Sequence, residues 1–509
     1  MGRSEAASRP AAAGSGSYKW VALSCTSLGA LLSVLNSTTL IIALPEVMKG
    51  LQASFEEVVW VLMGYMLAIT VLVPSIGRVA DMAGRKKLYV AGFAVFTAGS
   101  LVSGLAQSGA QLIVFRLVQA VGGSLMLANS TAIVTDAFPR GELGKALGVN
   151  AMVISVASLL GPILGGYLTE LGWRWVFWFN VPLGVVGTWW AAAQLREVVR
   201  LPGGQRFDWP GAMTFVLGLL GILVVLSFGP LVGWLQPAML GLDAVSIAAL
   251  AAFVWWERRF DQPMLDLSLF RNRLLAAAYV SNLLNGVARG AVTLLLVFYF
   301  QGIRGYDPVK AGVMLSPMAA AMMAVAPVSG ALSDRYGSRE LSSIGLLASA
   351  VGLWGLTRIQ PGTGLWTLGL WMAVVGAGSG FFNSPNTNAI MSAVAPGRRG
   401  IAGATRTMMM NAGSVISMAL GLSAIISTMT PEALAGLFAG TQVGSQGIAI
   451  GQFIEALHFT FWVSVAISVL AAVLSLMRGK HSPATATGQQ EAAATPGPAQ
   501  RVVESSGGK

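Results

Sequence analysis

The chain has 509 residues, of which 55% are hydrophobic and only 10% are charged. A soluble chain of this length would carry about a quarter charged residues, so the composition excludes an ordinary soluble protein. The formal charge of +11 does not indicate nucleic-acid binding, because the basic residues interrupt apolar runs instead of forming one stripe. Cys25 is the only cysteine, which excludes an intramolecular disulfide and a cysteine metal cluster.

Long apolar runs follow one another along almost the whole chain. A membrane-crossing helix needs about 20 mostly apolar residues. The first run is too long for the apolar part of a cleavable signal peptide. The tails, residues 1–18 and 478–509, are rich in small and polar residues and are expected to be disordered. In chain order, fourteen spans are predicted at about 19–44, 57–76, 88–106, 111–134, 145–168, 175–195, 210–229, 237–256, 274–300, 311–332, 341–357, 365–394, 403–427 and 452–477.

The basic residues predict the orientation of these spans. If the N-terminus is inside, 25 of the 32 lysines and arginines are cytoplasmic, five are outside and two lie in spans. Short cytoplasmic loops carry such an excess of positive charge. The sequence therefore predicts a multi-pass plasma-membrane protein with both termini in the cytoplasm.

Two short charged islands, 253 residues apart, share one pattern. Glycine precedes aspartate by four positions, a second glycine follows by three, and arginine closes the island. The small residues suit close helix crossing and turns, and the aspartates can make contacts that form in one conformation and break in another. The islands provide a predicted cytoplasmic gate with these residues: Gly77, Asp81, Gly84, Arg85, Gly330, Asp334, Gly337 and Arg339.

The position of the repeat predicts the architecture. One island follows the second span and the other follows the tenth, as expected for an internally duplicated transporter. Two six-helix bundles, 19–195 and 274–477, would then flank an inserted two-helix unit at 196–273. The fold class is therefore an all-α membrane protein with fourteen transmembrane helices.

Over 19–477 the chain resembles the major facilitator superfamily, and within it the fourteen-helix drug:proton antiporter (multidrug efflux) group. Beside the islands, the resemblance rests on Leu35–Pro45 in the first span, Phe115–Gly123 around Arg116, and the connection Trp173–Pro182. The antiporter motif of the fifth span is matched, with alanine in place of one expected glycine, by Gly148, Ala157, Gly161, Pro162, Gly165 and Gly166. The resemblance implies two rocking bundles, and it implies export of amphipathic organic compounds or drugs by alternating access.

One residue departs from the family pattern. Asn36 stands where the group has aspartate, and asparagine cannot bind and release a proton. This difference argues against the usual proton coupling and against a preference for cationic drugs. Asp136, near the inner end of the fourth span, and the pair Glu455 and His458 are the remaining candidates for proton binding.

Charges inside spans are costly and usually functional. By resemblance, Arg116 would take part in proton transfer, while snorkelling to the surface is the alternative. Asn282, Asn285 and Arg289 share one helix face at spacings of three and four, which is expected to face the bundle interior or a wet cavity. Asn383 and Asn386 are further candidates for the substrate or proton path, although helix packing also accounts for them.

Three functions remain open. The first is export of amphipathic compounds, and the second is export of a specific anionic or lipid-like metabolite with atypical proton coupling. The third is a membrane sensor or scaffold that transports nothing. The sequence indicates no enzyme, no metal and no cofactor. The expected partners are a small-molecule substrate, protons as a candidate coupling ion, and the lipid bilayer, with no nucleic acid, and the expected state is a monomer.

Overall fold

The computed structural model describes residues 17–139, 142–197, 207–260, 264–265, 267–394, 398–429 and 447–478, and these are almost entirely helical. Most of the two expected disordered tails lies outside these residues. The helices are α1 Tyr18–Leu51, α2 Phe55–Ala83, α3 Arg85–Ser103, α4 Gly109–Ala137, α5 Leu143–Leu171, α6 Trp175–Trp178, α7 Asn180–Gln194, α8 Trp209–Val232, α9 Pro237–Glu257, η2 Leu267–Arg271, α10 Arg273–Phe298, η3 Tyr299–Ile303, α11 Pro308–Met314, α12 Ser316–Tyr336, α13 Ser338–Leu356, α14 Leu365–Ser392, α15 Arg399–Thr428 and α17 Gly447–Leu476.

Twelve helical segments in the described part are long and apolar enough to cross a membrane. Each predicted apolar run is occupied by a helix, but α3 and α13, of 19 residues each, are not among the twelve. They are the helices that directly follow the two charged islands. The structure thus shows an all-helical membrane protein with twelve candidate spans.

Helix starts and close helix pairs follow from local sequence. Ser54 begins α2 with a capping box, in which its side chain and that of Glu57 each accept a backbone N–H bond from the other residue. Small residues let backbones approach closely inside a membrane. A Cβ atom on Gly345 of α13 would lie 2.6 Å from the carbonyl oxygen of Gly378 in α14.

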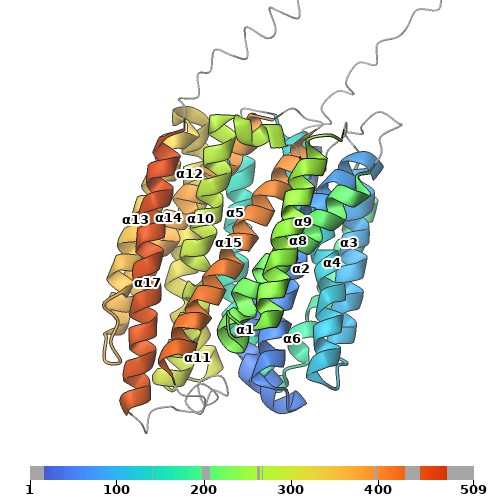
Figure 1. Cartoon of the computed structure of the whole chain (residues 1–509). Helices are drawn as coiled ribbons and strands as arrows, with labels where there is room; N and C mark the ends of the chain where they lie inside the picture. The colour runs from blue at the N-terminus through green and yellow to red at the C-terminus, as the bar shows by residue number, and fades with distance from the viewer. Residues whose placement is uncertain are drawn as a thin grey trace, which may run out of the picture.

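The helices run side by side and pack into two groups (Figure 1). In the first half, α4 packs against α2 and α3, and α1 packs against α5. In the second half, α14 packs against α12 and α13, and α10 packs against α15 and α17. The first half consists of α1–α7 and the second half of α10–α17. The two halves meet along two seams. One seam lies between α5 and the pair α11 and α12, and the other lies between α15 and α2.

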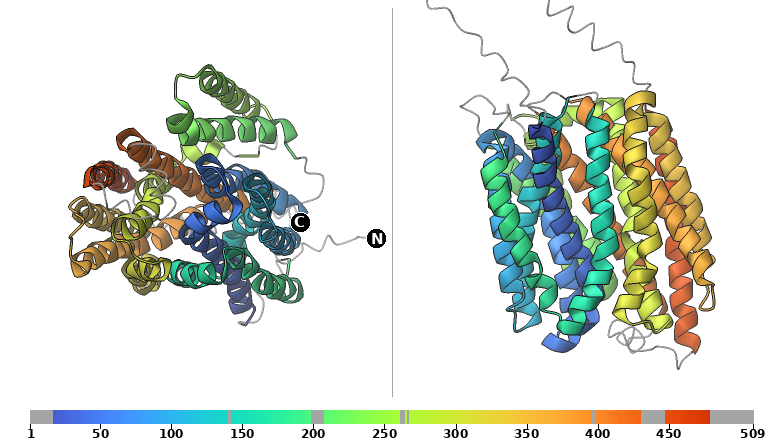
Figure 2. Two further views of the ribbon diagram at one scale, coloured as in Figure 1. Left: turned by 90° about the horizontal axis from the view of Figure 1, so that it is seen from below. Right: turned by 180° about the vertical axis from the view of Figure 1, so that it is seen from behind.

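Helices α8 and α9 form a pair at the edge of the molecule (Figure 2). α8 contacts both α2 and α15, whereas α9 packs mainly on α8. The connection after α9 continues this contact, because Met264 is fully buried and its sulfur accepts a hydrogen bond from Ser75 of α2 at 3.1 Å. The pair therefore covers one of the two seams between the groups.

Candidate functional site

The second glycine of each island makes the turn that the sequence predicts. Gly84 separates α2 from α3 with φ of 103°, and Gly337 separates α12 from α13 with φ of 88°. These backbone angles are strained for any residue with a side chain. Each glycine N–H ends the preceding helix, bonding to Ala80 at 3.0 Å and to Ser333 at 3.1 Å.

The first glycine of each island touches the opposite half of the protein. A Cβ atom on Gly77 of α2 would lie 2.6 Å from the Cβ of Ala404 in α15. On Gly330 of α12 it would lie 2.4 Å from the carbonyl oxygen of Gly144 in α5. The duplicated glycines thus occupy matching places at the two seams, where a larger residue would separate the halves.

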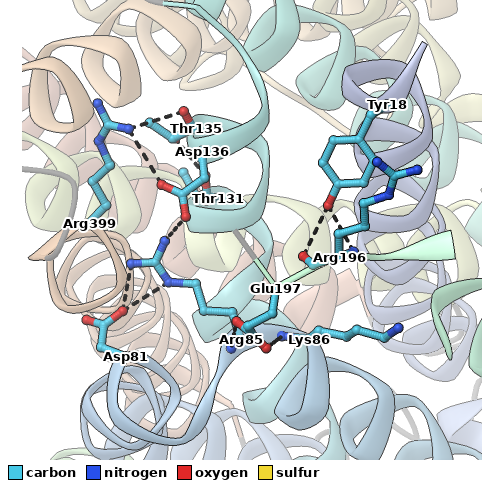
Figure 3. A network of polar contacts seen from close by, with 10 residues as sticks. All are labelled: Tyr18, Asp81, Arg85, Lys86, Thr131, Thr135, Asp136, Arg196, Glu197 and Arg399. Atoms are coloured by element: carbon cyan, nitrogen blue, oxygen red, sulfur yellow. Dashed lines mark hydrogen bonds and ion pairs between the residues drawn. The ribbon is translucent and has the colours of Figure 1, made fainter. Parts of the chain in front are cut away.

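A buried network of four charged side chains joins the first island to the second half (Figure 3). Arg85 donates to Asp81 through Nε at 3.0 Å and Nη2 at 2.7 Å, and it also pairs with Asp136 of α4. Arg399 of α15 lies 3.5 Å from Asp136 and donates to the carbonyl of Thr135 at 3.2 Å. Two carboxylates therefore balance two guanidinium groups across the seam.

Asp81 also faces the start of α15. A Cβ atom on Gly400, in the first turn of that helix, would lie 2.2 Å from Oδ1 of Asp81. A helix N-terminus carries a partial positive charge and unpaired N–H groups, so a carboxylate is favoured there. The contact holds α2 of one half against α15 of the other.

A further acidic residue supports the turn of the first island. Glu197, after α7, accepts backbone N–H bonds from Arg85 at 2.8 Å and Lys86 at 3.2 Å. A side chain on Gly84 would displace it, since a Cβ atom there would lie 2.5 Å from its Oε2. The sequence predicted no role for Glu197 or Arg399, since both lie just outside the predicted spans 175–195 and 403–427.

The second island repeats the backbone of the first, but only part of its charged side chains is described. The side chain of Asp334 lies outside the described part of the structure. Arg339 is half-buried, and its Nε has no hydrogen-bond partner among the described residues. The backbone of the second island matches the first, and its charged contacts remain a prediction.

The antiporter motif lies along the seam formed by α5. Gly148 faces the backbone of α12, and Gly166 faces Val309 of α11, with hypothetical Cβ distances of 3.0 Å and 2.8 Å. Gly161 and Gly165 face α1 instead, against Thr38 and Thr39. Pro162 is buried against Gly312 of α11, and Ala157 is fully buried. These small residues let α5 pack closely on both halves at once.

A cavity of about 360 Å³ lies between the two halves. The first half lines it from α1, α2, α4 and α5, and the second half from α10, α12, α14 and α15. Methionines at 66, 322 and 410 provide apolar surface. Among the described residues that line the cavity are two arginines, Arg289 and Arg406, and no aspartate or glutamate.

Of the residues predicted for the substrate or proton path, Arg289 and Asn383 line this cavity. The amides Asn282, Asn285 and Asn386 lie in the bundle interior instead, which is one of the two places expected for the helix face that carries Asn282 and Asn285. Asn282 is buried and donates to the carbonyl of Arg406 at 2.7 Å, and Asn386 donates to that of Ala278 at 3.3 Å. Asn285 is also buried away from the cavity lining. Asn282 and Asn386 thus lie at helix contacts, where each amide donates to the backbone of a neighbouring helix.

Asn36 and Arg116 belong to one buried chain of contacts inside the first half. Arg116 donates to Gln119, and Gln119 donates to Asn36 at 3.1 Å. The guanidinium also lies 4.0 Å from the ring centroid of Tyr65. Arg116 is 1% exposed, so snorkelling to the membrane surface does not occur. It lines a second cavity of about 170 Å³ that shares Tyr65 with the larger one.

The alternative proton pair near the start of α17 does not form in this structure. Glu455 is exposed, whereas His458 is partly buried with Nε2 2.6 Å from the carbonyl of Ile359. Arg406 is the cavity residue that sequence reasoning missed, because it was assigned to the cytoplasmic loop. Its place inside the predicted span 403–427 was the available signal.

The sequence profile of the Major Facilitator Superfamily matches residues 26–418 and 278–506. This chain belongs to that superfamily. It is 28% identical over 459 residues to the riboflavin transporter RibZ of Clostridioides difficile, covering 90% of this chain and 97% of the relative. It is 30% identical over 430 residues to multidrug resistance protein 3 of Bacillus subtilis, covering 84% and 83%.

Solved structures agree on the fold. The crystal structure of the human organic anion transporter MFSD10 (TETRAN) superposes with a TM-score of 0.62 at 16% identity, covering 90% of this chain and 99% of that one. At this identity the likeness concerns the fold alone. Together with the superfamily membership, the helices identify the chain as a multi-pass membrane transporter.

Proposed function

We propose that this major facilitator protein exports amphipathic organic compounds from the cytoplasm by alternating access. The observation that carries the proposal is a cavity lined from both halves, next to a charged network that joins them. Similarity to a relative named for multidrug resistance supports outward transport. The substrate would occupy the cavity while the seams on its two sides open in turn.

We extend the proposal to fourteen spans, with α3 and α13 crossing the membrane. Nineteen helical residues extend about 28 Å at 1.5 Å each, close to the ~30 Å apolar core of a bilayer. Both helices pack beside long spans, α3 on α4 and α13 on α14. Residues 19–195 and 274–477 would be the two moving bundles, with 196–273 as an inserted pair.

Contacts at the island end of the molecule support cytoplasmic termini. Lys19 pairs with Glu142 at 2.5 Å, so the start of α1 lies beside the turn between α4 and α5. Tyr18 donates to the carbonyl of Arg196 at 3.2 Å, after α7. Basic residues gather at this same end, as the positive-inside rule requires for the cytoplasmic face.

The network suggests how the cytoplasmic seam opens. Asp81, Arg85 and Asp136 lie in the first half, so their mutual contacts can persist during a rigid-body movement. The contacts of Asp136 with Arg399, and of Asp81 with the start of α15, cross the seam and must break. These crossing contacts would act as the cytoplasmic latch.

Reconstituted flux tests the proposal. Liposomes containing only the purified protein would be loaded with amphipathic dyes of positive, zero and negative charge, and dye movement would be compared with protein-free liposomes. Saturable movement of at least one dye is expected. Absence of movement for every dye, in protein that remains folded, would favour the sensor or scaffold function.

A further inference from the structure

Arg289 and Arg406 face the central cavity without compensating negative charge. Arg289 reaches it from α10 and Arg406 from α15. The Nε atom of each is buried and has no hydrogen-bond partner among the residues that the structure describes. Neither forms an ion pair with a described residue, and no carboxylate lines the cavity. A guanidinium group stays charged at every relevant pH.

Two other buried arginines of this protein have carboxylate partners, whereas the buried Arg116 donates to the side-chain amide of Gln119. Arg85 pairs with Asp81 and Asp136, and Arg399 pairs with Asp136. Inside a membrane an ionised residue is retained where it pairs with another group or serves transport. The absence of a carboxylate beside the two cavity arginines, among the residues that the structure describes, indicates that their counter-charge arrives with the transported molecule.

The two arginines are held by one closely packed helix pair. A Cβ atom on Gly286 of α10 would lie 2.4 Å from the carbonyl oxygen of Met410, and one on Gly413 of α15 would lie 2.2 Å from that of Leu283. Asn282 of α10 also donates to the backbone at Arg406. The close backbone contact therefore holds α10 and α15 together, so that both arginines reach the cavity from one helix pair.

The rest of the cavity fits an amphipathic molecule. Hydroxyl groups of Ser37 and Thr38 line it from the first half, opposite the arginines. Apolar side chains, among them Met66, Ile69 and Met322, line other parts of the wall. A volume of about 360 Å³ is within the usual range for small-molecule sites.

We propose that the cavity binds organic anions, with a carboxylate, sulfonate or phosphate group between Arg289 and Arg406. The apolar body of the anion lies against Met66, Ile69 and Met322. Guanidinium groups bind such oxyanions through paired, charge-assisted hydrogen bonds. The same positive charge repels cations, so the site discriminates against cationic drugs. This inference rests on the proposed function and defines its substrate class.

Binding to a matched set of ligands tests the charge preference. Naphthylacetate, naphthylacetamide and naphthylethylammonium have similar apolar bodies and carry negative, zero and positive charge. Binding to the full-length protein in discs of neutral lipid would be measured by calorimetry. We expect the anion to bind about tenfold or more tightly than the other two, because hydrogen bonds to charged groups are the stronger ones. Equal or tighter binding of the cation would overturn the proposal.

Substitutions locate the site. Arg289→Gln and Arg406→Gln should each weaken anion binding about tenfold, whereas Arg358→Gln, which removes an exposed arginine outside the cavity, should not. Arg289→Lys and Arg406→Lys keep the charge and should lose less affinity, which covers the case in which a glutamine variant does not fold. Anion binding that is unchanged in the cavity variants would contradict the assignment.

The anion can come from water or from the bilayer, and the lipid composition separates the two sources. Saturable naphthylacetate binding in neutral lipid assigns a water-soluble anion. Arginine-dependent competition by an added anionic phospholipid, without naphthylacetate binding, assigns a lipid headgroup. If neither naphthylacetate nor the anionic phospholipid binds, the anion site is wrong, even if the liposome experiment shows export of cations. If the anion binds but no dye crosses the liposome membrane, the proposed export function is wrong and the anion site stands.

Discussion

Asn36 replaces the aspartate expected on the first span, and its surroundings explain why this matters. Its side chain is fully buried in the first half and accepts from Gln119, which in turn accepts from Arg116. An amide at this position cannot carry a proton, and no carboxylate lines the cavity in the part of the chain that the structure describes. We therefore expect native transport to depend little on a pH gradient.

Asn36→Asp should make flux respond to the pH gradient, because it adds to α1 a carboxyl group that can bind and release a proton. The measurement is dye flux in liposomes with imposed and with dissipated gradients. Asn150→Asp, on the cavity wall in α5, distinguishes this position from a general effect of added charge. If native flux already collapses without the gradient, a proton site exists elsewhere, with Asp136 the first to examine.

Asp81 is the second residue for which the structure predicts a measurable effect of substitution. Asp81→Asn removes the charge that faces the start of α15 and leaves Arg85 paired with Asp136. The cytoplasmic seam should lose about 1–2 kcal/mol of stabilisation, which shifts the population toward the open seam. Spin labels at Lys87→Cys and Arg335→Cys, in a Cys25→Ser background, would report the distance between the halves. Glu142→Gln, an exposed acid at the same end, should leave that distance unchanged.

At the scale of helices, the two seams depend on backbone contact that only small residues allow. Gly77 meets α15, and Gly330 meets α5. Each contact joins an island of one half to a helix of the other half. The duplicated sequence pattern therefore reflects two equivalent mechanical contacts.

Gly77→Ala should wedge the seam between α2 and α15 apart, because the added Cβ would lie 2.6 Å from that of Ala404. The label distance defined above should lengthen in a larger fraction of molecules, and flux should slow. Gly241→Ala is the matched control, since a Cβ atom there meets nothing within 4 Å. A distance distribution identical in both variants and the native protein would exclude Gly77 from the seam movement.

At the scale of the whole molecule, the inserted pair raises the predicted number of spans without disturbing the two halves. α8 rests on α2 and α15, and α9 lies outside it (Figure 2). Because the pair adds two crossings between the halves, the second half keeps its orientation. The two islands then lie at the same membrane face.

Reporter fusions test this topology. Fusions after Gly50, Gly203, Gly362 and Lys480 should report outside, inside, outside and inside, since the basic residues of the connections favour the cytoplasm. Outside reporting at Lys480 would contradict an even number of spans. If α13 does not cross, Gly362 should report inside and Lys480 outside, because three more helices cross after Gly362.

Sequence alone determined the features that depend on local chemistry. Run length located the helices, and the need for a positive φ located the turns at Gly84 and Gly337. The distribution of lysine and arginine predicted on which side of the membrane each connection between spans lies. The resemblance to the major facilitator superfamily needed only short motifs.

Tertiary structure alone decided which polar side chains reach the cavity. Helical spacing put Asn282 and Arg289 on one face, but packing of α15 covers the asparagine and leaves the arginine at the cavity. Arg399 and Arg406 gained their roles from neighbours far away in the chain. The physical reason is that helix periodicity defines a face, whereas the helix that covers this face is chosen by contacts between distant segments.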